Sequence, residues 1–157
     1  REIGAGTIGL TTNRNTRLSE ICDICIAPVV GPEVVAGSTR LKSGTAQKLV
    51  LNMLTTGVMI KLGKVYNNLM VDLKASNAKL YDRSIRIVRT VTGVSHDEAV
   101  DVLKRADLQV KTAIMMIETG MDRAQAEDVL QRHEGRLKSA IRSVKAGMGE
   151  AKKQGGD

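Results

Sequence analysis

Residues 31–48 read GPEVVAGSTRLKSGTAQK and lead directly into a long segment with apolar residues at helical spacing. The stretch combines glycines, hydroxyl side chains and cations. Glycines let the backbone approach a ligand, while hydroxyls and the N–H groups at a helix start donate to anions. Two interpretations follow: a phosphate or carboxylate site, or a tight loop whose hydroxyls cap the next helix. The spacing matches neither the P-loop nor the dinucleotide fingerprint.

Two helices are expected after this stretch. The first is predicted by apolar residues at helical spacing, and Gly63 is its expected stop; the residues are Ala46, Leu49, Val50, Met53 and Leu54. The second is predicted to start with Ser76 as its N-cap and to end at Gly93. One face of the second helix is expected to be buried; it carries Leu80, Ser84, Ile87, Val88 and Val91. Five methionines at apolar positions of the chain are interpreted as core residues: Met53, Met59, Met70, Met115 and Met116.

Two runs rich in β-forming residues precede the loop. Residues 5–12 and 22–27 flank a short helical stretch at 16–21. Two apolar strands separated by a helix are typical of the edge of a parallel α/β sheet. A two-stranded sheet is not stable on its own, which suggests that the chain lacks a complement.

The C-terminal part contains an internal repeat. Residues 92–114 align without gaps on residues 119–141, and ten of the 23 aligned positions are identical. Each copy is predicted to form a helical hairpin that opens with a Thr-Gly break. Such short helices are not stable alone, but two packed hairpins can share a core.

Each copy also carries a predicted helix cap. Ser95 with Glu98 is predicted to form a capping box, and Asp122 with Gln125 a looser one. The segment 147–157 is polar and glycine-rich, and it is predicted to be a disordered tail.

Composition restricts the classes of function. The net charge is +7, but Tyr66 and Tyr81 are the only aromatic residues, so there is no stacking platform for bases and we expect no nucleic-acid partner. No apolar run reaches the roughly 20 residues that cross a bilayer. The chain begins with Arg1 and shows no leader, which suggests a fragment or a processed chain. Cys22 and Cys25 are interpreted as two buried, reduced thiols of a cytoplasmic protein, and no metal site is expected.

Residues 31–83 carry a more specific pattern. Gly-Pro-Glu, Gly-Ser-Thr-Arg-Leu-Lys and Gly-Thr-Ala-Gln-Lys are followed by Gly-Lys-Val-Tyr, Asn-Leu-Met-Val-Asp and Asn-Ala-Lys-Leu. This block closely resembles the N-acetylmuramic acid 6-phosphate etherases and their relative, the glucokinase regulatory protein. The likeness extends from about residue 5 to about residue 141.

The resemblance implies an α/β fold in two domains. Residues 1–75 would be the C-terminal part of a sugar isomerase domain, a parallel α/β sandwich. Residues 76–146 would form a small all-helical module that resembles ubiquitin-associated domains. The resemblance also implies a cytoplasmic homodimer.

The resemblance further implies a lyase. It would cleave the D-lactyl ether of N-acetylmuramic acid 6-phosphate into N-acetylglucosamine 6-phosphate and D-lactate, by elimination and hydration, with no metal or other cofactor. The glutamate acid and base and the phosphate-gripping serine loop belong to the family's N-terminal half, so this fragment alone is expected to be inactive. The alternative is a non-catalytic regulatory module that binds a sugar phosphate.

Five residues are candidates for the site. Glu33 is a weak catalytic candidate, because the resemblance places the catalytic glutamates upstream, and a role in orienting the loop or the dimer contact is favoured over direct chemistry. Ser38, Thr39 and Arg40 are the expected substrate contacts; Arg40 would pair a phosphate or carboxylate, or else a nearby acid. Lys79 looks like the position at which the regulatory relative reaches the sugar phosphate, and its alternative is a solvated helix lysine.

Overall fold

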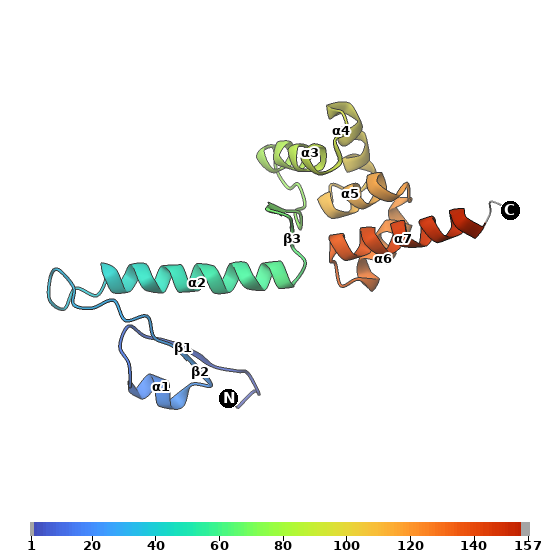
Figure 1. Cartoon of the computed structure of the whole chain (residues 1–157). Helices are drawn as coiled ribbons and strands as arrows, with labels where there is room; N and C mark the ends of the chain where they lie inside the picture. The colour runs from blue at the N-terminus through green and yellow to red at the C-terminus, as the bar shows by residue number, and fades with distance from the viewer. Residues whose placement is uncertain (1, 155–157) are drawn as a thin grey trace. The chain divides into compact units, whose positions relative to one another are not determined.

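The computed structural model describes residues 2–154, and it describes the surroundings of side chains as far as Met148. The chain divides after Gly57 into two compact units, which we describe separately. Within the described residues the structure is rich in helix, with four short strands (Figure 1). This agrees with the predicted α/β class. The predicted domain boundary between residues 75 and 76 stays a prediction.

The first unit opens with a strand, a helix and a strand, as predicted. Strands β1 (Ile8–Leu10) and β2 (Ile24–Ile26) pair in parallel, with helix α1 (Arg17–Ile21) between them. The Thr7 hydroxyl donates a 2.8 Å hydrogen bond to the Asp23 carboxylate, and so fixes the start of the two strands. Both cysteines of this unit are free thiols, but they are only half-buried, so the prediction that they are buried was wrong.

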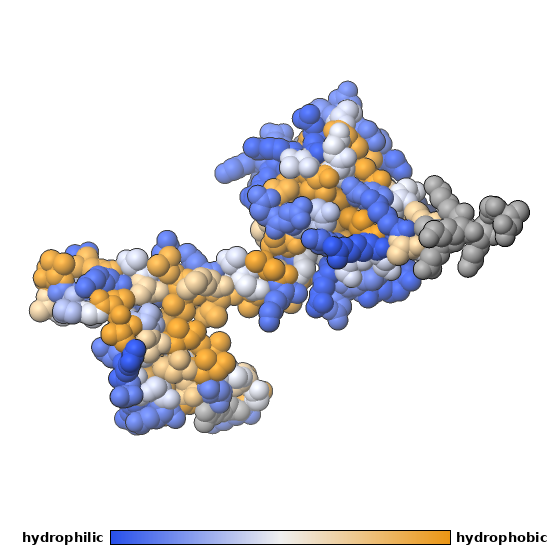
Figure 2. Space-filling view, viewed as in Figure 1, coloured by the Kyte–Doolittle hydropathy of each residue, from blue (hydrophilic) through white to orange (hydrophobic). Residues whose placement is uncertain are grey.

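Helix α2 (Lys42–Lys61) starts four residues before the predicted apolar run and ends just before Gly63. Of its residues only Ser43 and Val50 are buried. Large apolar side chains are exposed along the rest of it: Leu49, Leu51, Met53, Leu54, Val58, Met59 and Ile60. Figure 2 shows this apolar surface in orange. A helix that is apolar on every side is typical of a buried position in a larger protein.

A small hairpin follows α2 and was not predicted. Strands β3 (Val65–Tyr66) and β4 (Leu69–Met70) pair in antiparallel register across a two-residue turn. Asn67 takes φ 53°, a left-handed conformation that asparagine tolerates better than most residues. The hairpin brings Asp72 back toward α2, where its carboxylate pairs with Lys64 at 2.6 Å.

Helix α3 (Ala78–Thr92) begins one residue later than predicted. Its N-cap is Asn77, whose side-chain oxygen accepts a 2.9 Å hydrogen bond from the Leu80 amide, so the prediction of Ser76 was wrong by one position. Gly93 ends the helix with φ 77°, as predicted. The predicted inner face is confirmed by its most deeply buried members, which are Ser84, Ile87 and Val88.

The repeat forms two helical hairpins, as predicted. The first copy contains α4 (His96–Arg105) and the start of α5 (Val110–Thr119). The second contains α6 (Arg123–Arg132) and the start of α7 (Leu137–Gln154). Helix α5 is central, because it packs on α3, α4, α6 and α7. One contiguous core therefore joins both copies to α3.

Equivalent positions of the two copies supply most of this core. The buried pairs, each separated by 27 residues, are Ala99 and Ala126, Val102 and Val129, Leu103 and Leu130, Val110 and Leu137, Ala113 and Ala140, and Ile114 and Ile141. The predicted core role of methionine is confirmed for Met115, which is fully buried. Met116 is also buried, but the prediction is wrong for Met53, Met59 and Met70, whose side chains are exposed.

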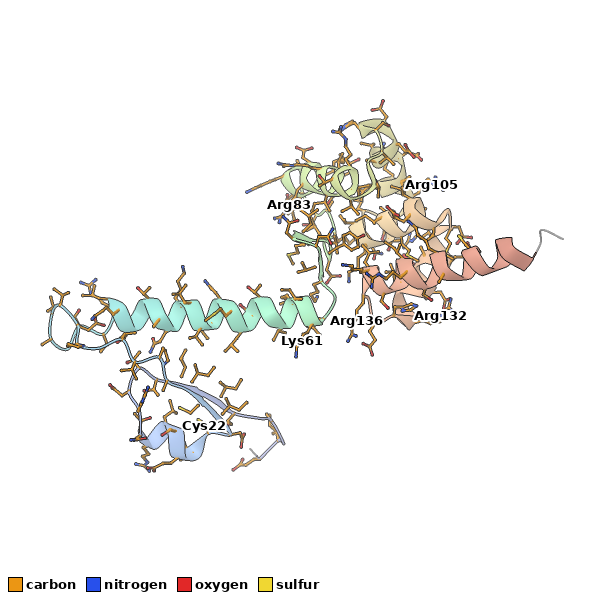
Figure 3. All side chains as sticks on the ribbon, in the orientation of Figure 1. Cys22, Lys61, Arg83, Arg105, Arg132 and Arg136 are labelled. Carbon is orange, nitrogen blue, oxygen red and sulfur yellow. The ribbon has the colours of Figure 1, made fainter. Side chains whose placement is uncertain are left out.

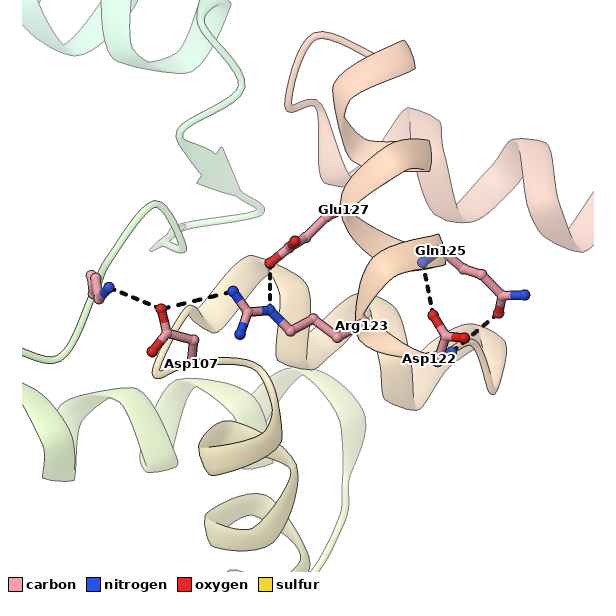
Figure 4. A network of polar contacts seen from close by, with 6 residues as sticks. Asp107, Asp122, Arg123, Gln125 and Glu127 are labelled. Carbon is pink, nitrogen blue, oxygen red and sulfur yellow. Dashed lines mark hydrogen bonds and ion pairs between the residues drawn. The ribbon is translucent and has the colours of Figure 1, made fainter.

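The two helix caps reverse the predicted order of strength. Asp122 and Gln125 form the complete capping box, in which each side chain accepts from the other's backbone N–H. Ser95 accepts a 3.2 Å hydrogen bond from the Glu98 amide, which is one half of such a box. Figure 4 shows the complete box beside a second polar group.

That second group ties the two copies to the segment after the hairpin. The Asp107 carboxylate accepts a 3.0 Å hydrogen bond from Lys74 and lies 3.8 Å from the Arg123 guanidinium. Arg123 in turn donates a 2.8 Å hydrogen bond to Glu127 (Figure 4). The hydrogen bond from Lys74 holds the pKa of Asp107 below its usual value.

Helix α7 continues to Gln154, so residues 147–154 of the predicted tail are helical in the structure. Ala, Met, Glu, Lys and Gln fill most of this stretch, and these are good helix formers. Residues 155–157, the rest of the predicted tail, lie outside the described residues.

Candidate functional site

Glu33 caps the N-terminus of helix α2. Its two carboxylate oxygens accept hydrogen bonds from the backbone N–H groups of Lys42 and Ser43, each at 3.0 Å. These two bonds, the one from Ser43 first, lower the pKa of Glu33 below its ordinary value. A carboxylate held ionised in this way is a weak proton donor at neutral pH.

The loop between Glu33 and α2 is closed by its own backbone. The Ser38 amide donates to the carbonyl of Val35 at 3.0 Å, and the Gly44 amide donates to the carbonyl of Thr39 at 3.0 Å. Gly37 takes φ 79°, which a side chain would strain. The loop is therefore a defined turn whose tip is formed by residues 37–40.

The predicted substrate contacts lie together at this tip. Ser38 is half-buried, whereas Thr39 and Arg40 are exposed. Within the described part of the chain no carboxylate pairs with the Arg40 guanidinium. Three adjacent donors, two of them exposed, are suited to a phosphate or carboxylate group.

An apolar cavity lies beside the tip. It measures about 680 Å³ and is lined by Val30, Leu41, Lys42, Thr45, Ala46 and Leu49. The sequence analysis did not identify it, although Ala46 and Leu49 belong to the apolar run that predicted α2. Polar donors at the rim of an apolar cavity are a common arrangement in small-molecule sites.

Lys79 belongs to the second compact unit, whereas the loop belongs to the first. It is exposed in the first turn of α3. Two further cations of this helix, Arg83 and Arg86, line a cavity of about 260 Å³ together with Asn68; Figure 3 labels Arg83. The sequence analysis missed both arginines. Arg83 lies four residues after Lys79 and three before Arg86, and this helical spacing could have indicated that the three cations share one face of α3.

Within the described residues, no cluster of three or more His, Cys, Asp or Glu side chains is arranged to hold a metal ion. In the same part of the chain, every helix is too short or too polar to cross a bilayer.

Comparison with known proteins shows which families this chain resembles. Residues 67–112 match the C-terminal lid domain of glucokinase regulatory protein. The N-acetylmuramic acid 6-phosphate etherase of Alkaliphilus metalliredigens is 61% identical over 115 residues, which are 73% of this chain and 38% of the relative. Those of Caldanaerobacter subterraneus subsp. tengcongensis and Vibrio campbellii are 59% and 60% identical over 74% of this chain and 38% of each relative.

Over about three quarters of its length the chain is similar to N-acetylmuramic acid 6-phosphate etherases. It spans 38–40% of the length of the curated etherases that it matches. The word C-terminal in the name of the lid domain agrees with the expectation that this chain corresponds to the C-terminal half of an etherase.

Proposed function

We propose that this chain is part of a lyase that cleaves the D-lactyl ether of N-acetylmuramic acid 6-phosphate. The products are N-acetylglucosamine 6-phosphate and D-lactate, formed by elimination of lactate and addition of water. The observation that carries the proposal is identity of 56–61% to proteins named as this etherase, over about three quarters of the chain.

In this proposal the tip of the loop binds an anionic group of the substrate. The Arg40 guanidinium forms paired hydrogen bonds with a phosphate or with the lactyl carboxylate, while Ser38 and Thr39 add hydroxyl donors. Lys79, considered separately, contacts the sugar phosphate of the substrate. The exposed position of Thr39, Arg40 and Lys79 supports these roles.

Glu33 acts in this proposal as a positioning residue. Because both of its oxygens hold the start of α2, the carboxylate fixes the end of the loop that carries Arg40. The acid and base that move protons are glutamates from the rest of the protein. No metal and no other cofactor takes part.

The finer features of the fold belong to the same proposal. The parallel strands β1 and β2 are part of a sugar isomerase sandwich that spans residues 1–75, and the exposed apolar α2 is covered in a cytoplasmic homodimer. Residues 76–146 form the module that resembles ubiquitin-associated domains, and the short helices α4, α5 and α6 support it. Sedimentation tests the dimer: a monodisperse monomer of the extended protein would contradict it.

A D-lactate assay tests the function. The 157-residue chain and a version extended upstream to the full length of the relatives are each incubated with N-acetylmuramic acid 6-phosphate. We expect lactate from the extended version and none from the short chain, which lacks the acid and base. Saturable substrate binding by the extended version without lactate release would instead support the regulatory alternative, which the names of the relatives do not favour.

Two variants of the extended version test the residues. Arg40→Gln and Lys79→Gln are expected to raise the KM at least roughly tenfold, because each removes a charge-assisted hydrogen bond. Lys48→Gln, an exposed cation of α2 outside the tip, is the matched control and should leave the KM unchanged.

A further inference from the structure

The turn between α6 and α7 forms one side of a pocket that the proposed lyase function does not use. The pocket measures about 650 Å³, and its cations are Arg136, Lys138 and Arg142. His133 also lines it, with its Nδ1 atom 3.0 Å from the Ser139 hydroxyl oxygen. We call it the α6–α7 pocket; Figure 3 labels Arg136 at the start of α7.

The cations of this pocket are poorly neutralised. Arg136 pairs with Glu134 at 2.8 Å, and both side chains are exposed. Among the described residues, no carboxylate pairs with Lys138 or Arg142. The pocket therefore keeps a net charge of about +2 (three cations and one anion), which matches a phosphomonoester dianion.

The internal repeat shows that, within the described part of the chain, one cation of this pocket has lost the carboxylate partner that its equivalent in the first copy has. Lys138 stands 27 residues after Lys111, at the same position of the second copy. Lys111 is 14% exposed, and its ammonium group lies 3.0 Å from the Asp72 carboxylate. The first copy thus receives an anion from the chain itself. The second copy has the same cation without a chain carboxylate.

Arg142 adds a cation to the second copy where the first copy has an apolar residue. It stands at the position of Met115, which is fully buried against the core. The side chain at position 142 is exposed, which explains why this residue is polar. Exposure does not explain why it is a third cation beside Arg136 and Lys138. An arginine at this point adds a planar donor suited to phosphate.

A neighbouring cavity gives the contrast. It measures about 410 Å³, and its lining holds two lysines, Lys74 and Lys111, and two carboxylates, Asp72 and Glu127. Its charges are balanced within the protein. Of these two pockets, only the α6–α7 pocket has an excess of positive charge. The duplication of the backbone therefore does not explain that excess.

We propose that the α6–α7 pocket binds a small ligand through a phosphomonoester group. Lys138 and Arg142 contact the phosphate oxygens, and the hydroxyl of Ser139 donates a further hydrogen bond. The inference does not rest on the proposed lyase function, because none of its residues takes part in that proposal.

Titration of the ¹⁵N-labelled 157-residue chain with inorganic phosphate at low ionic strength tests the site by amide chemical shifts. We expect saturable shifts centred on residues 136–143. Lys138→Gln and Arg142→Gln should each weaken phosphate binding roughly tenfold, since each removes a charge-assisted hydrogen bond. Lys104→Gln, an exposed cation of α4, is the matched control and should bind phosphate as the unchanged chain does.

Three results would overturn the proposal. Shifts that never saturate, or that spread over exposed cations elsewhere, would indicate an adventitious ion only. If the two variants bound phosphate as tightly as the control, Lys138 and Arg142 would not be the residues that contact it. Acetate binding as tightly as phosphate would contradict a phosphomonoester. Separate arms with glucosamine 6-phosphate and phosphoserine distinguish a sugar source of the phosphate from an amino-acid source.

Discussion

Leu108 and Gly135 lie 27 residues apart at the same point of the two repeat copies, and both have a left-handed backbone, with φ 61° and 70°. Each amide donates to the carbonyl five residues earlier, Leu103 in the first copy and Leu130 in the second, at 2.9 and 2.8 Å. The duplication therefore includes the turn between the helices, down to its hydrogen bonds. The backbone, not the side chain, is what the two copies share here.

Gly135 should be sensitive to substitution. Gly135→Ala places a Cβ on a left-handed residue and 3.2 Å from the Lys111 ammonium nitrogen, so we expect a loss of about 1–2 kcal/mol in the free energy of unfolding. Thermal or urea unfolding of the chain measures it.

Gly147→Ala is the matched control for that variant. Gly147 is helical, and an added Cβ meets nothing within 4 Å. The control should keep stability or gain up to about 1 kcal/mol. Equal stability of the two variants would show that the turn is not held in its left-handed conformation.

The capping box at the start of α6 leads to a second prediction. Asp122→Ala removes the acceptor of the 2.8 Å bond from the Gln125 amide, and should cost about 1 kcal/mol. Ser95→Ala should cost less, because Ser95 forms only half of a box, with a longer bond of 3.2 Å. Chemical unfolding of both variants checks the order, and the reverse order would contradict it.

Asp72 joins the hairpin segment to α5. Burial alone would raise the pKa of Asp72, but hydrogen bonds from Lys64 and Lys111 hold it below its usual value. Asp72→Asn should destabilise the second unit by about 1 kcal/mol, a discounted figure because the carboxylate is a third exposed. Lys64→Gln should cost less, since Lys64 is itself 36% exposed whereas Lys111 is 14% exposed. Unfolding monitored by circular dichroism measures both.

Glu33 leads to a prediction about local stability. Glu33→Ala should speed hydrogen exchange at the Lys42 and Ser43 amides by roughly threefold to thirtyfold, the range expected of a lost cap. The Lys48 amide, farther along the helix, should change less. Unchanged exchange at Ser43 would contradict the cap.

The same carboxylate sets a pH dependence. Because folding lowers the pKa of Glu33, its contribution is fully present above its ordinary value of 4.5 and is lost as the pH falls through the lower folded value. Protection of the Ser43 amide should thus be constant from neutral pH to about 5, and fall below 4.5. Glu33→Gln should remove this dependence.

Local signals in the sequence predicted most helix ends. Gly93 was predicted as a stop, and the structure gives it the left-handed backbone that favours glycine at this point. Ser76 and Asn77 are both good N-cap acceptors. Asn77 is the cap because the backbone becomes helical only after it. Sequence patterns do not resolve one-residue differences of this kind.

Two features depended on information that the sequence pattern carries weakly. The strands β3 and β4 have two residues each, too few to show alternation, and only the Asn67 turn could have indicated them. The cap that Glu33 gives to Lys42 spans nine residues, well beyond the three that separate partners in a capping box. The sequence therefore predicted which residues form the candidate site. It did not predict the hydrogen bond between Glu33 and the Lys42 amide that shapes the loop.

The most direct test of the central claim is lactate release by complementation. The 157-residue chain and a separately produced upstream segment, together equal to the length of the relatives, are assayed alone and mixed with N-acetylmuramic acid 6-phosphate. We predict D-lactate from the mixture and none from either part alone. Lactate release by the 157-residue chain alone would contradict the account, because it would place the acid and base within this half.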